Sequence, residues 1–245
     1  MLQIKKVLIL IFLPIGLLLT VPAKAEPIYH EVYYPEGSGP FPAVIALHTS
    51  GGFKTVKKQI KKYTGAGFAV YAPNFFKRHE ITHRNRFDTW TVYRAKIEAE
   101  LIEIVGLAKQ DPKVDGKNVF AVGFSNGGYW ATFLAAKNHV NAGASHYGVW
   151  AWPESYDFDG YPALYLDKGS NPVLAIHGDN DSVQKPDNVY PELDAAEQRS
   201  PKFSKFIFKE AGHSWDGKRS DDGFFQDATD KALQLTIDLF KKNMK

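Results

Sequence analysis

The stretch KNVFAVGFSNGG, residues 117–128, decides the fold because it leads an apolar, β-branched run into a G-x-S-x-G turn. Residues 129–137 leave that turn with helical periodicity. A strand, a sharp turn at a serine and a helix make up a nucleophile elbow, which lifts the serine hydroxyl above a sheet. The glycines permit the strained turn, and the helix N-terminus behind it favours developing negative charge. We therefore expect Ser125 to be a catalytic nucleophile.

On both sides of this turn, short apolar runs alternate with longer amphipathic segments, which predicts a parallel sheet with helices on both faces. The expected strands are Ile28–Tyr34, Ala43–His48, Ala69–Ala72, Val119–Gly123, Gly143–Gly148, Val173–His177 and Phe206–Lys209. The expected helices are Thr55–Ala66, Trp90–Gln110, Asn126–Lys137, Asn188–Arg199 and Asp227–Lys242. The fold class is α/β, with a mostly parallel sheet of about seven to eight strands and no large lid domain. No repeat, linker or low-complexity tract divides residues 26–245, so we expect one domain there.

The first 25 residues have the composition of a secretory signal peptide. Two lysines precede an apolar run at residues 7–21, and Ala-Lys-Ala at 23–25 matches a cleavage site. The run of 15 residues is shorter than the ~20 that a membrane-spanning helix needs. We predict cleavage after Ala25, with an uncleaved anchor as the alternative.

Composition limits the partners of the mature chain. Removing Lys5, Lys6 and Lys24 with the signal segment takes the formal charge from +3 to zero, which gives no basis for nucleic-acid binding. The absence of cysteine excludes disulfides, a thiolate metal site and lipid attachment through an N-terminal cysteine. We expect a secreted or periplasmic monomer that acts on a small molecule, without metal or organic cofactor and without stable membrane insertion after cleavage.

Two later loops supply the partners that a serine nucleophile needs, in the order Ser, Asp, His that is typical of an α/β-hydrolase. GDNDSV at 178–183 follows one expected strand, and EAGHSW at 210–215 follows the next. We predict that His213 is the general base and that Asp181, further past its strand than Asp179, is the acid. Asp179 is expected to stabilise the turn, and His177, at the strand end, to be structural.

The oxyanion hole of such a site uses two backbone amides, one directly after the nucleophile and one from the loop after an early strand. The first is predicted to be the amide of Asn126. HTSGG at 48–52 is the early loop, and we predict Ser50 as the second donor. Its two glycines allow the backbone to approach the substrate closely.

Two further loops follow the carboxyl ends of strands, where open α/β sheets place ligands. Residues 77–89 are rich in arginine and histidine, and residues 150–165 are rich in tryptophan and tyrosine. We expect Arg78 to favour an acidic group and Trp150 and Trp152 to form one wall of the substrate site. The alternatives are a solvated charged loop and a packed surface loop.

Several segments resemble the dienelactone hydrolase family over essentially the whole mature chain. APNFFKR at 72–78 is similar to the family's C-P-D-L-Y-A-R, and AAKNHV at 135–140 followed by YGV at 147–149 is similar to its A-A-K…Y-Y-G-V. EAGHS at 210–214 matches its E-A-G-H-S/G around the histidine. The resemblance implies an α/β-hydrolase fold and hydrolysis of an ester or lactone.

The chain departs from the dienelactone hydrolases for which the family is named. Ser125 stands where they have cysteine, and Thr49 where they have a glutamate. Of the two arginines that bind their substrate carboxylate, Arg78 matches the first. The second position is Gly217, with basic residues only at the next two positions, and a lysine does not replace a bidentate arginine. We therefore do not expect dienelactone itself to be the substrate.

Together these features predict an exported serine hydrolase that cleaves a carboxylic ester or lactone through an acyl-enzyme on Ser125. One alternative is an esterase that acts on a polymer, either an acetylated polysaccharide or a polyester. A peptidase is a less favoured alternative, because the extra domain of many such peptidases is missing. The last alternative is a non-catalytic binding protein with the hydrolase fold.

Overall fold

The computed structural model describes residues 28–152, 160–216 and 226–245, so the predicted signal peptide at 1–25 lies outside it. Seven strands form one sheet in the order β1-β3-β2-β4-β5-β6-β7, and β1 alone pairs antiparallel with its neighbour. The strands are β1 (His30–Tyr33), β2 (Phe41–Leu47), β3 (Ala69–Pro73), β4 (Val114–Phe124), β5 (Gly143–His146), β6 (Val173–Gly178) and β7 (Phe203–Phe208).

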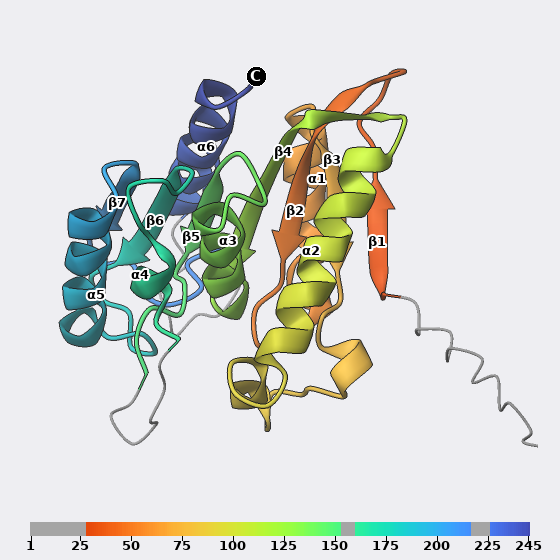
Figure 1. Ribbon diagram of the computed structural model, residues 1–245. Coiled ribbons are helices and arrows are strands. Elements are labelled where there is room, and N and C mark those ends of the chain that lie inside the picture. Colours follow the sequence, from red (N-terminus) through yellow and green to blue (C-terminus); the bar gives the residue numbers. More distant parts are fainter. Residues whose placement is uncertain (1–27, 153–159, 217–225) are drawn as a thin grey trace, which may run out of the picture.

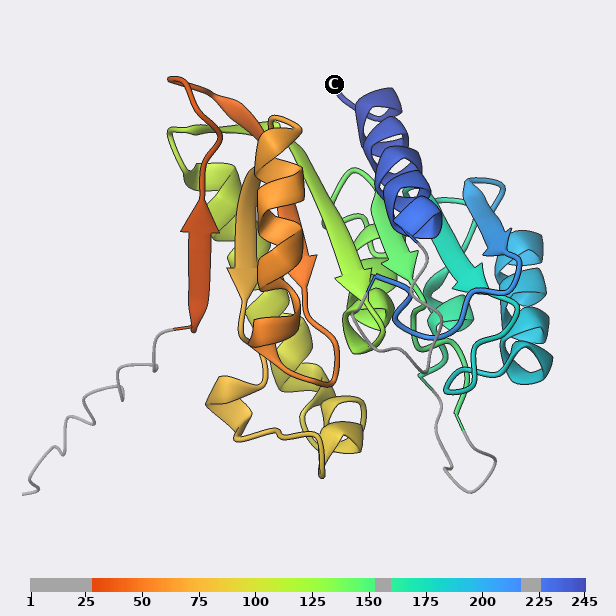
Figure 2. The same ribbon diagram turned by 180° about the vertical axis from the view of Figure 1, so that it is seen from behind.

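Helices cover both faces of this sheet (Figures 1 and 2). On one face lie α2 (Arg94–Gln110), α3 (Asn126–Ala136), α4 (Pro162–Tyr165) and α5 (Pro186–Arg199). On the other lie α1 (Lys57–Gly65) and α6 (Gln226–Lys242). Three 3-10 turns, Phe53–Thr55, Lys77–His79 and Arg86–Thr89, complete the described elements. The arrangement confirms the predicted α/β-hydrolase class.

The side chains of β2 alternate between two hydrophobic cores, one on each face of the sheet. Ala43, Ile45 and Leu47 pack with the helices of the α2 face, whereas Val44 and Ala46 pack with α1 and α6. All five side chains are fully buried. Because neighbouring residues of a strand point to opposite faces, a continuous apolar run is what a strand covered on both sides requires.

The predicted elements are present, but several ends differ for local reasons. β4 begins at Val114 rather than Val119. α2 begins at Arg94, because the amide of Tyr93 donates to the carbonyl of Asp88 in the preceding turn. β5 ends at His146, because Tyr147 has a φ of 36° and leaves the extended conformation.

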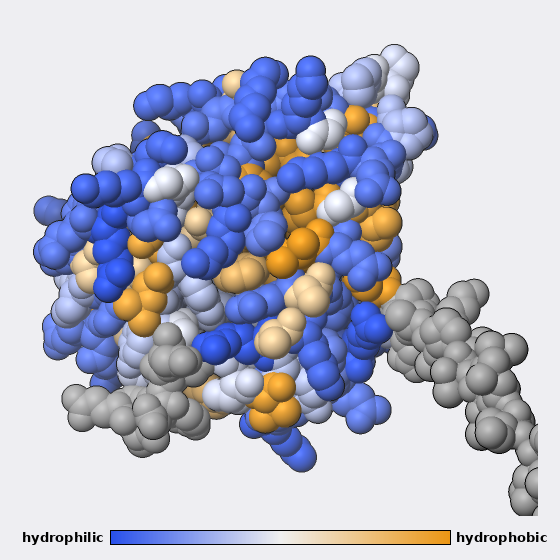
Figure 3. All heavy atoms as spheres, in the orientation of Figure 1, coloured by the Kyte–Doolittle hydropathy of each residue, from blue (hydrophilic) through white to orange (hydrophobic). Residues whose placement is uncertain are grey.

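The parallel strands end together at the edge of the sheet that lies lower in Figure 1, and the loops that follow β2, β4, β6 and β7 therefore share one side of the sheet. Hydrophilic residues cover most of the face in Figure 3, with smaller apolar areas between them. None of the helices in residues 28–152, 160–216 and 226–245 has the length and apolar character of a membrane span.

Candidate active site

The turn between β4 and α3 holds Ser125 in a strained backbone conformation, with φ 51° and ψ −112°. The glycines two residues before it and two residues after it have no room for a side chain. A Cβ on Gly123 would lie 1.8 Å from the carbonyl oxygen of Gly127, and a Cβ on Gly127 would lie 2.2 Å from that of Leu47. The two glycines therefore let β4, α3 and β2 approach closely enough to form the elbow.

Ser125, His213 and Asp181 form a chain of hydrogen bonds. The Ser125 hydroxyl donates to His213 Nε2 across 3.0 Å, and His213 Nδ1 donates to Asp181 Oδ2 across 2.8 Å. The three residues follow β4, β7 and β6, and each is at most 8% exposed. A hydroxyl, an imidazole in this tautomer and a carboxylate in line are the parts of an activated serine nucleophile.

The Asp181 carboxylate is held on both oxygens. Oδ1 accepts the amides of Val183 at 2.9 Å and Gln184 at 2.8 Å, which leaves Oδ2 for His213. Burial raises the pKa of Asp181, but the hydrogen bond from His213, the electrostatic effect of the His213 and His177 imidazoles and the Gln184 amide outweigh it. The pKa therefore lies below its ordinary value, and the group is ionised at neutral pH.

Two other histidines that end strands near the site have partners of their own. His177 Nε2 donates to the Gln184 carbonyl at 2.9 Å and lies 3.5 Å from Asp181 Oδ2. Burial lowers the pKa of His177 despite the nearby carboxylate. His48 donates from Nδ1 to the carbonyl of Thr49 at 2.8 Å, and burial lowers its pKa to about 4. Both are therefore neutral imidazoles with structural contacts.

Asp179 connects the acid loop to the base loop. Its Oδ1 accepts the amide of Glu210 at 2.5 Å, and its own amide donates to the carbonyl of Phe208. The turn-stabilising contact that we expected for Asp179 is thus made across two loops rather than within one.

The two predicted oxyanion donors lie on adjoining segments. Asn126 is the first residue of α3, so its amide has no acceptor within the helix. In the described part of the chain, neither this amide nor that of Ser50 donates to another protein group. The Asn126 side chain joins the segments, because Nδ2 lies 3.4 Å from Ser50 Oγ and 3.4 Å from Thr89 Oγ1. Sequence reasoning had not singled out Thr89, which lies in a loop without periodicity.

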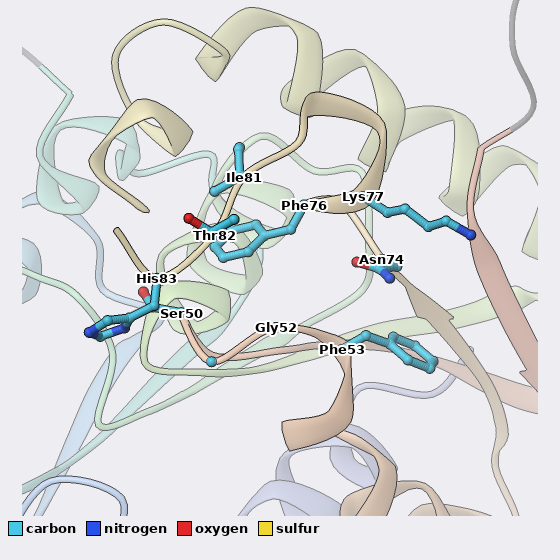
Figure 4. A pocket seen from close by; sticks show the side chains of 10 residues that line it. Ser50, Gly52, Phe53, Asn74, Phe76, Lys77, Ile81, Thr82 and His83 are labelled. Carbon is cyan, nitrogen blue, oxygen red and sulfur yellow. The ribbon is translucent and has the colours of Figure 1, made fainter. Parts of the chain in front are cut away.

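A cavity of about 360 Å³ lies beside Ser50, between residues 50–53 and residues 74–83 (Figure 4). The side chains of Ser50 and His83 lie near one another, and Phe76 and Thr82 face the same space. Lys77 points away from it, with Nζ 3.9 Å from the centre of the Tyr29 ring. The lining mixes apolar rings with hydroxyl and imidazole groups.

Arg78 lines a different cavity, of about 480 Å³, between its 3-10 turn and α2. Burial raises the pKa of the Glu100 carboxyl to about 7, although the charge of Arg78 opposes this rise. The Glu100 side chain also contacts His79 Nε2 at 3.0 Å. The structure does not bring Arg78 together with Ser125. Among the described residues, no three acidic or histidine side chains are grouped in a way that could hold a metal ion.

The two tryptophans expected at the substrate wall lie in the core. Trp150 is 1% exposed and packs edge-on against Phe203 of β7, with ring centres 5.6 Å apart. Trp152 is 6% exposed and packs against Trp90 at 5.4 Å. Gln184 holds this segment, because its Oε1 accepts the amide of Trp150 at 2.9 Å. Residues 153–159 of the aromatic loop lie outside the described residues, as do positions 217–219.

Comparisons with known proteins agree with this architecture. The family model of the dienelactone hydrolase family matches residues 29–244. A structure from Klebsiella pneumoniae subsp. pneumoniae, proposed to be a dienelactone hydrolase, superposes with a TM-score of 0.73 at 21% identity, covering 91% of this chain and 96% of that one. A thermophilic esterase from Thermogutta terrifontis with bound propionate gives 0.67 at 16% identity, covering 87% and 88%.

One curated relative shares part of its sequence with this chain. Human acyl-coenzyme A thioesterase 6 is 32% identical over 108 residues. The matched segment covers 44% of this chain and only 23% of the thioesterase.

Proposed function

The chain belongs to the dienelactone hydrolase family and is an ester hydrolase, and we propose that it cleaves a carboxylic ester or lactone through an acyl-enzyme on Ser125. The observation that carries the proposal is the continuous hydrogen-bond chain from the Ser125 hydroxyl through His213 to Asp181. The strained elbow supports it further, because such backbone strain persists where the surrounding structure maintains it for function.

In the proposed first step, Ser125 Oγ attacks the substrate carbonyl while His213 Nε2 takes the hydroxyl proton. Asp181, ionised and fixed by two amides, holds His213 in the accepting tautomer and stabilises the imidazolium that forms. His213 then gives the proton to the leaving alcohol, which leaves the acyl group on Ser125. Water, activated by the same imidazole, hydrolyses the acyl-enzyme in the second half of the reaction.

The amides of Asn126 and Ser50 are proposed to stabilise the tetrahedral oxyanion. Each such donor is typically worth ~10²–10³ in rate. The 360 Å³ cavity is lined by Ser50, so it offers space for the substrate beside that donor, and its volume suits a small ester. Arg78 faces Glu100 instead, so the proposal assigns it no contact with the substrate.

Hydrolysis of p-nitrophenyl esters from acetate to octanoate tests the function, with Ser125→Ala as the control. We expect turnover that depends on Ser125 and falls with chain length. A fluorophosphonate probe should label the wild type at Ser125 and leave the variant unlabelled. Near wild-type turnover by folded Ser125→Ala would refute the assignment of the nucleophile.

A thioester is the second candidate substrate, and the partial likeness to the human thioesterase favours it. The attack on the carbonyl would be the same, with a thiolate as the leaving group. Parallel assays of acetyl oxyesters and acetyl thioesters, the latter followed by release of free thiol, decide between the two. A kcat/KM at least tenfold higher for the thioester would make it the preferred class.

We further propose that the protein is exported and that a signal peptide is cleaved after Ala25. The lysines, the apolar run and the cleavage signal at residues 1–25 support this location. Mass spectrometry of the protein from its native host tests it, since the proposal requires a mature chain that begins at Glu26.

A further inference from the structure

Asp216, three residues after the proposed base, has a side chain that is only 5% exposed and that bonds to two other parts of the chain. The hydroxyl of Tyr147, directly after β5, donates to Oδ1 across 2.6 Å. Gln59 Nε2, on α1, donates to Oδ2. Lys58 adds its charge, with Nζ 3.5 Å from Oδ2, and donates to the Asp216 carbonyl. A buried carboxylate therefore joins the His213 loop to α1 and to the end of β5.

Tyr147 is also in contact with the proposed base itself. Its ring meets the His213 ring edge-on, with centres 5.1 Å apart, and meets the Trp215 ring at 4.7 Å. Tyr147 is 2% exposed, and its amide donates to the carbonyl of Ile176 in β6. The backbone of Tyr147 is thus fixed by β6, and its ring packs against the imidazole of His213.

The strand order explains why the His213 loop needs this support. β7, which precedes the loop, lies three strands from β4, which carries Ser125. At ~4.8 Å per strand, the imidazole must return across roughly 14 Å of sheet edge, over the ends of β6 and β5. Tyr147 is the residue directly after β5. In addition, Ser214 has a φ of 61°, and a non-glycine residue in that conformation is kept there only by surrounding contacts.

We propose that Asp216 and Tyr147 are positioning residues that hold His213 Nε2 against Ser125 by tying its loop to Gln59. Asp181 orients the imidazole through Nδ1, whereas the Asp216 contacts set where the whole loop lies. The proposal rests on His213 being the base, and it adds a second buried carboxylate with a separate task.

Kinetics of Asp216→Ala and Asp216→Asn test the proposal. Asp216→Ala removes both hydrogen bonds and should lower kcat for p-nitrophenyl acetate by ~10–100-fold with KM within about twofold, because small misplacements of a catalytic group cost rate. Asp216→Asn should retain most of kcat, because the oxygen of a flipped Gln59 amide can accept from the asparagine NH₂ while Tyr147 still donates to the asparagine oxygen. Tyr147→Phe, which keeps the ring, should lower kcat several-fold.

Lys57→Gln is the matched control on the same helix, since it removes the exposed pair with Glu31 at 3.7 Å and the contact of Nζ with the Phe53 ring at 5.3 Å, touches neither Asp216 nor His213, and should leave kcat unchanged. An unaltered kcat in folded Asp216→Ala or Tyr147→Phe would overturn the proposal. So would equal losses in Asp216→Ala and Asp216→Asn, because the effect would then come from the charge and not from the bonds. If Asp216→Ala does not fold, Tyr147→Phe decides.

A readout without substrate separates this proposal from the proposed function. The His213 Nδ1 proton, bonded to Asp181, should give a low-field NMR signal in the wild type that broadens or disappears in Asp216→Ala. If the signal behaves so while no ester is turned over, the positioning role stands and the proposed activity fails. A signal that is unchanged in Asp216→Ala refutes the positioning role alone.

Discussion

Asp181→Asn should reduce kcat by ~10⁴ while leaving the fold intact, because it reverses the tautomer of His213. The amides of Val183 and Gln184 point at one oxygen of the carboxylate, at 2.9 and 2.8 Å, so the single oxygen of an asparagine would stay with them. Its NH₂ group would then face His213 Nδ1, which would have to accept, and Nε2 would carry the proton. Such a histidine cannot take the proton of Ser125, a loss that typically costs ~10⁴ in kcat, or about 5 kcal/mol of barrier.

The assay is burst and steady-state hydrolysis of p-nitrophenyl acetate, with urea unfolding to show that the variant is folded. Asp179→Asn is the matched control, since Asp179 lies in the same loop as Asp181 and accepts the amide of Glu210 but does not touch His213. We expect the control to keep kcat within a few-fold. If folded Asp181→Asn kept a tenth or more of the wild-type kcat, the tautomer argument would be refuted.

Four other substitutions test the packing and a buried carboxyl group. Gly127→Ala would place a Cβ 2.2 Å from the Leu47 carbonyl oxygen and should lower the free energy of unfolding by ~3 kcal/mol or more. Gly106→Ala is the control, because a Cβ at this position of α2 meets open space, and it should raise the free energy of unfolding by ~0.5–1 kcal/mol. Urea unfolding measures both, and equal effects would contradict the clash. Burial raises the pKa of Glu100 from 4.5 to about 7, so its ionisation destabilises the folded state as pH rises through that window. The free energy of unfolding of Glu100→Gln should therefore fall less than that of the wild type between about pH 5 and 8. Urea unfolding across this pH range measures the difference, and an equal fall in the two proteins would contradict the prediction. Trp150→Ala should lower the free energy of unfolding by ~3–5 kcal/mol and leave KM for p-nitrophenyl acetate unchanged. A raised KM would instead indicate that Trp150 contacts the substrate.

The fold could be predicted from the sequence because its signals are local. The elbow needs only a strand, a G-x-S-x-G turn and a helix, and all of them lie within residues 117–137. The acid and base positions follow from chain order, since each loop comes directly after a recognisable apolar strand. The structure brings Ser125, Asp181 and His213 within hydrogen-bond distance, and their catalytic roles stay a prediction that the variants above test.

Side-chain direction in the loops could not be predicted in the same way. Arg78 lies in the 3-10 turn Lys77–His79, where it lines one cavity with Glu100 and its charge acts on that carboxyl. A polar loop has no periodicity from which that direction could be inferred. Likewise, an aromatic composition does not distinguish a ring that lines a site from one that packs in the core, as Trp150 does against Phe203.

The contacts that hold the base depend on strand order, which no local pattern in the sequence contains. Tyr147 and Asp216 are 69 residues apart, and Gln59 and Asp216 are 157 residues apart. They meet only because β5 lies between the strand of the nucleophile and the strand of the base, and because α1 covers the same side. Once that order is known, the histidine has one return path over the sheet edge, and any side chain at the end of β5 must either obstruct it or support it. A tyrosine whose hydroxyl is bonded to the loop itself supports it.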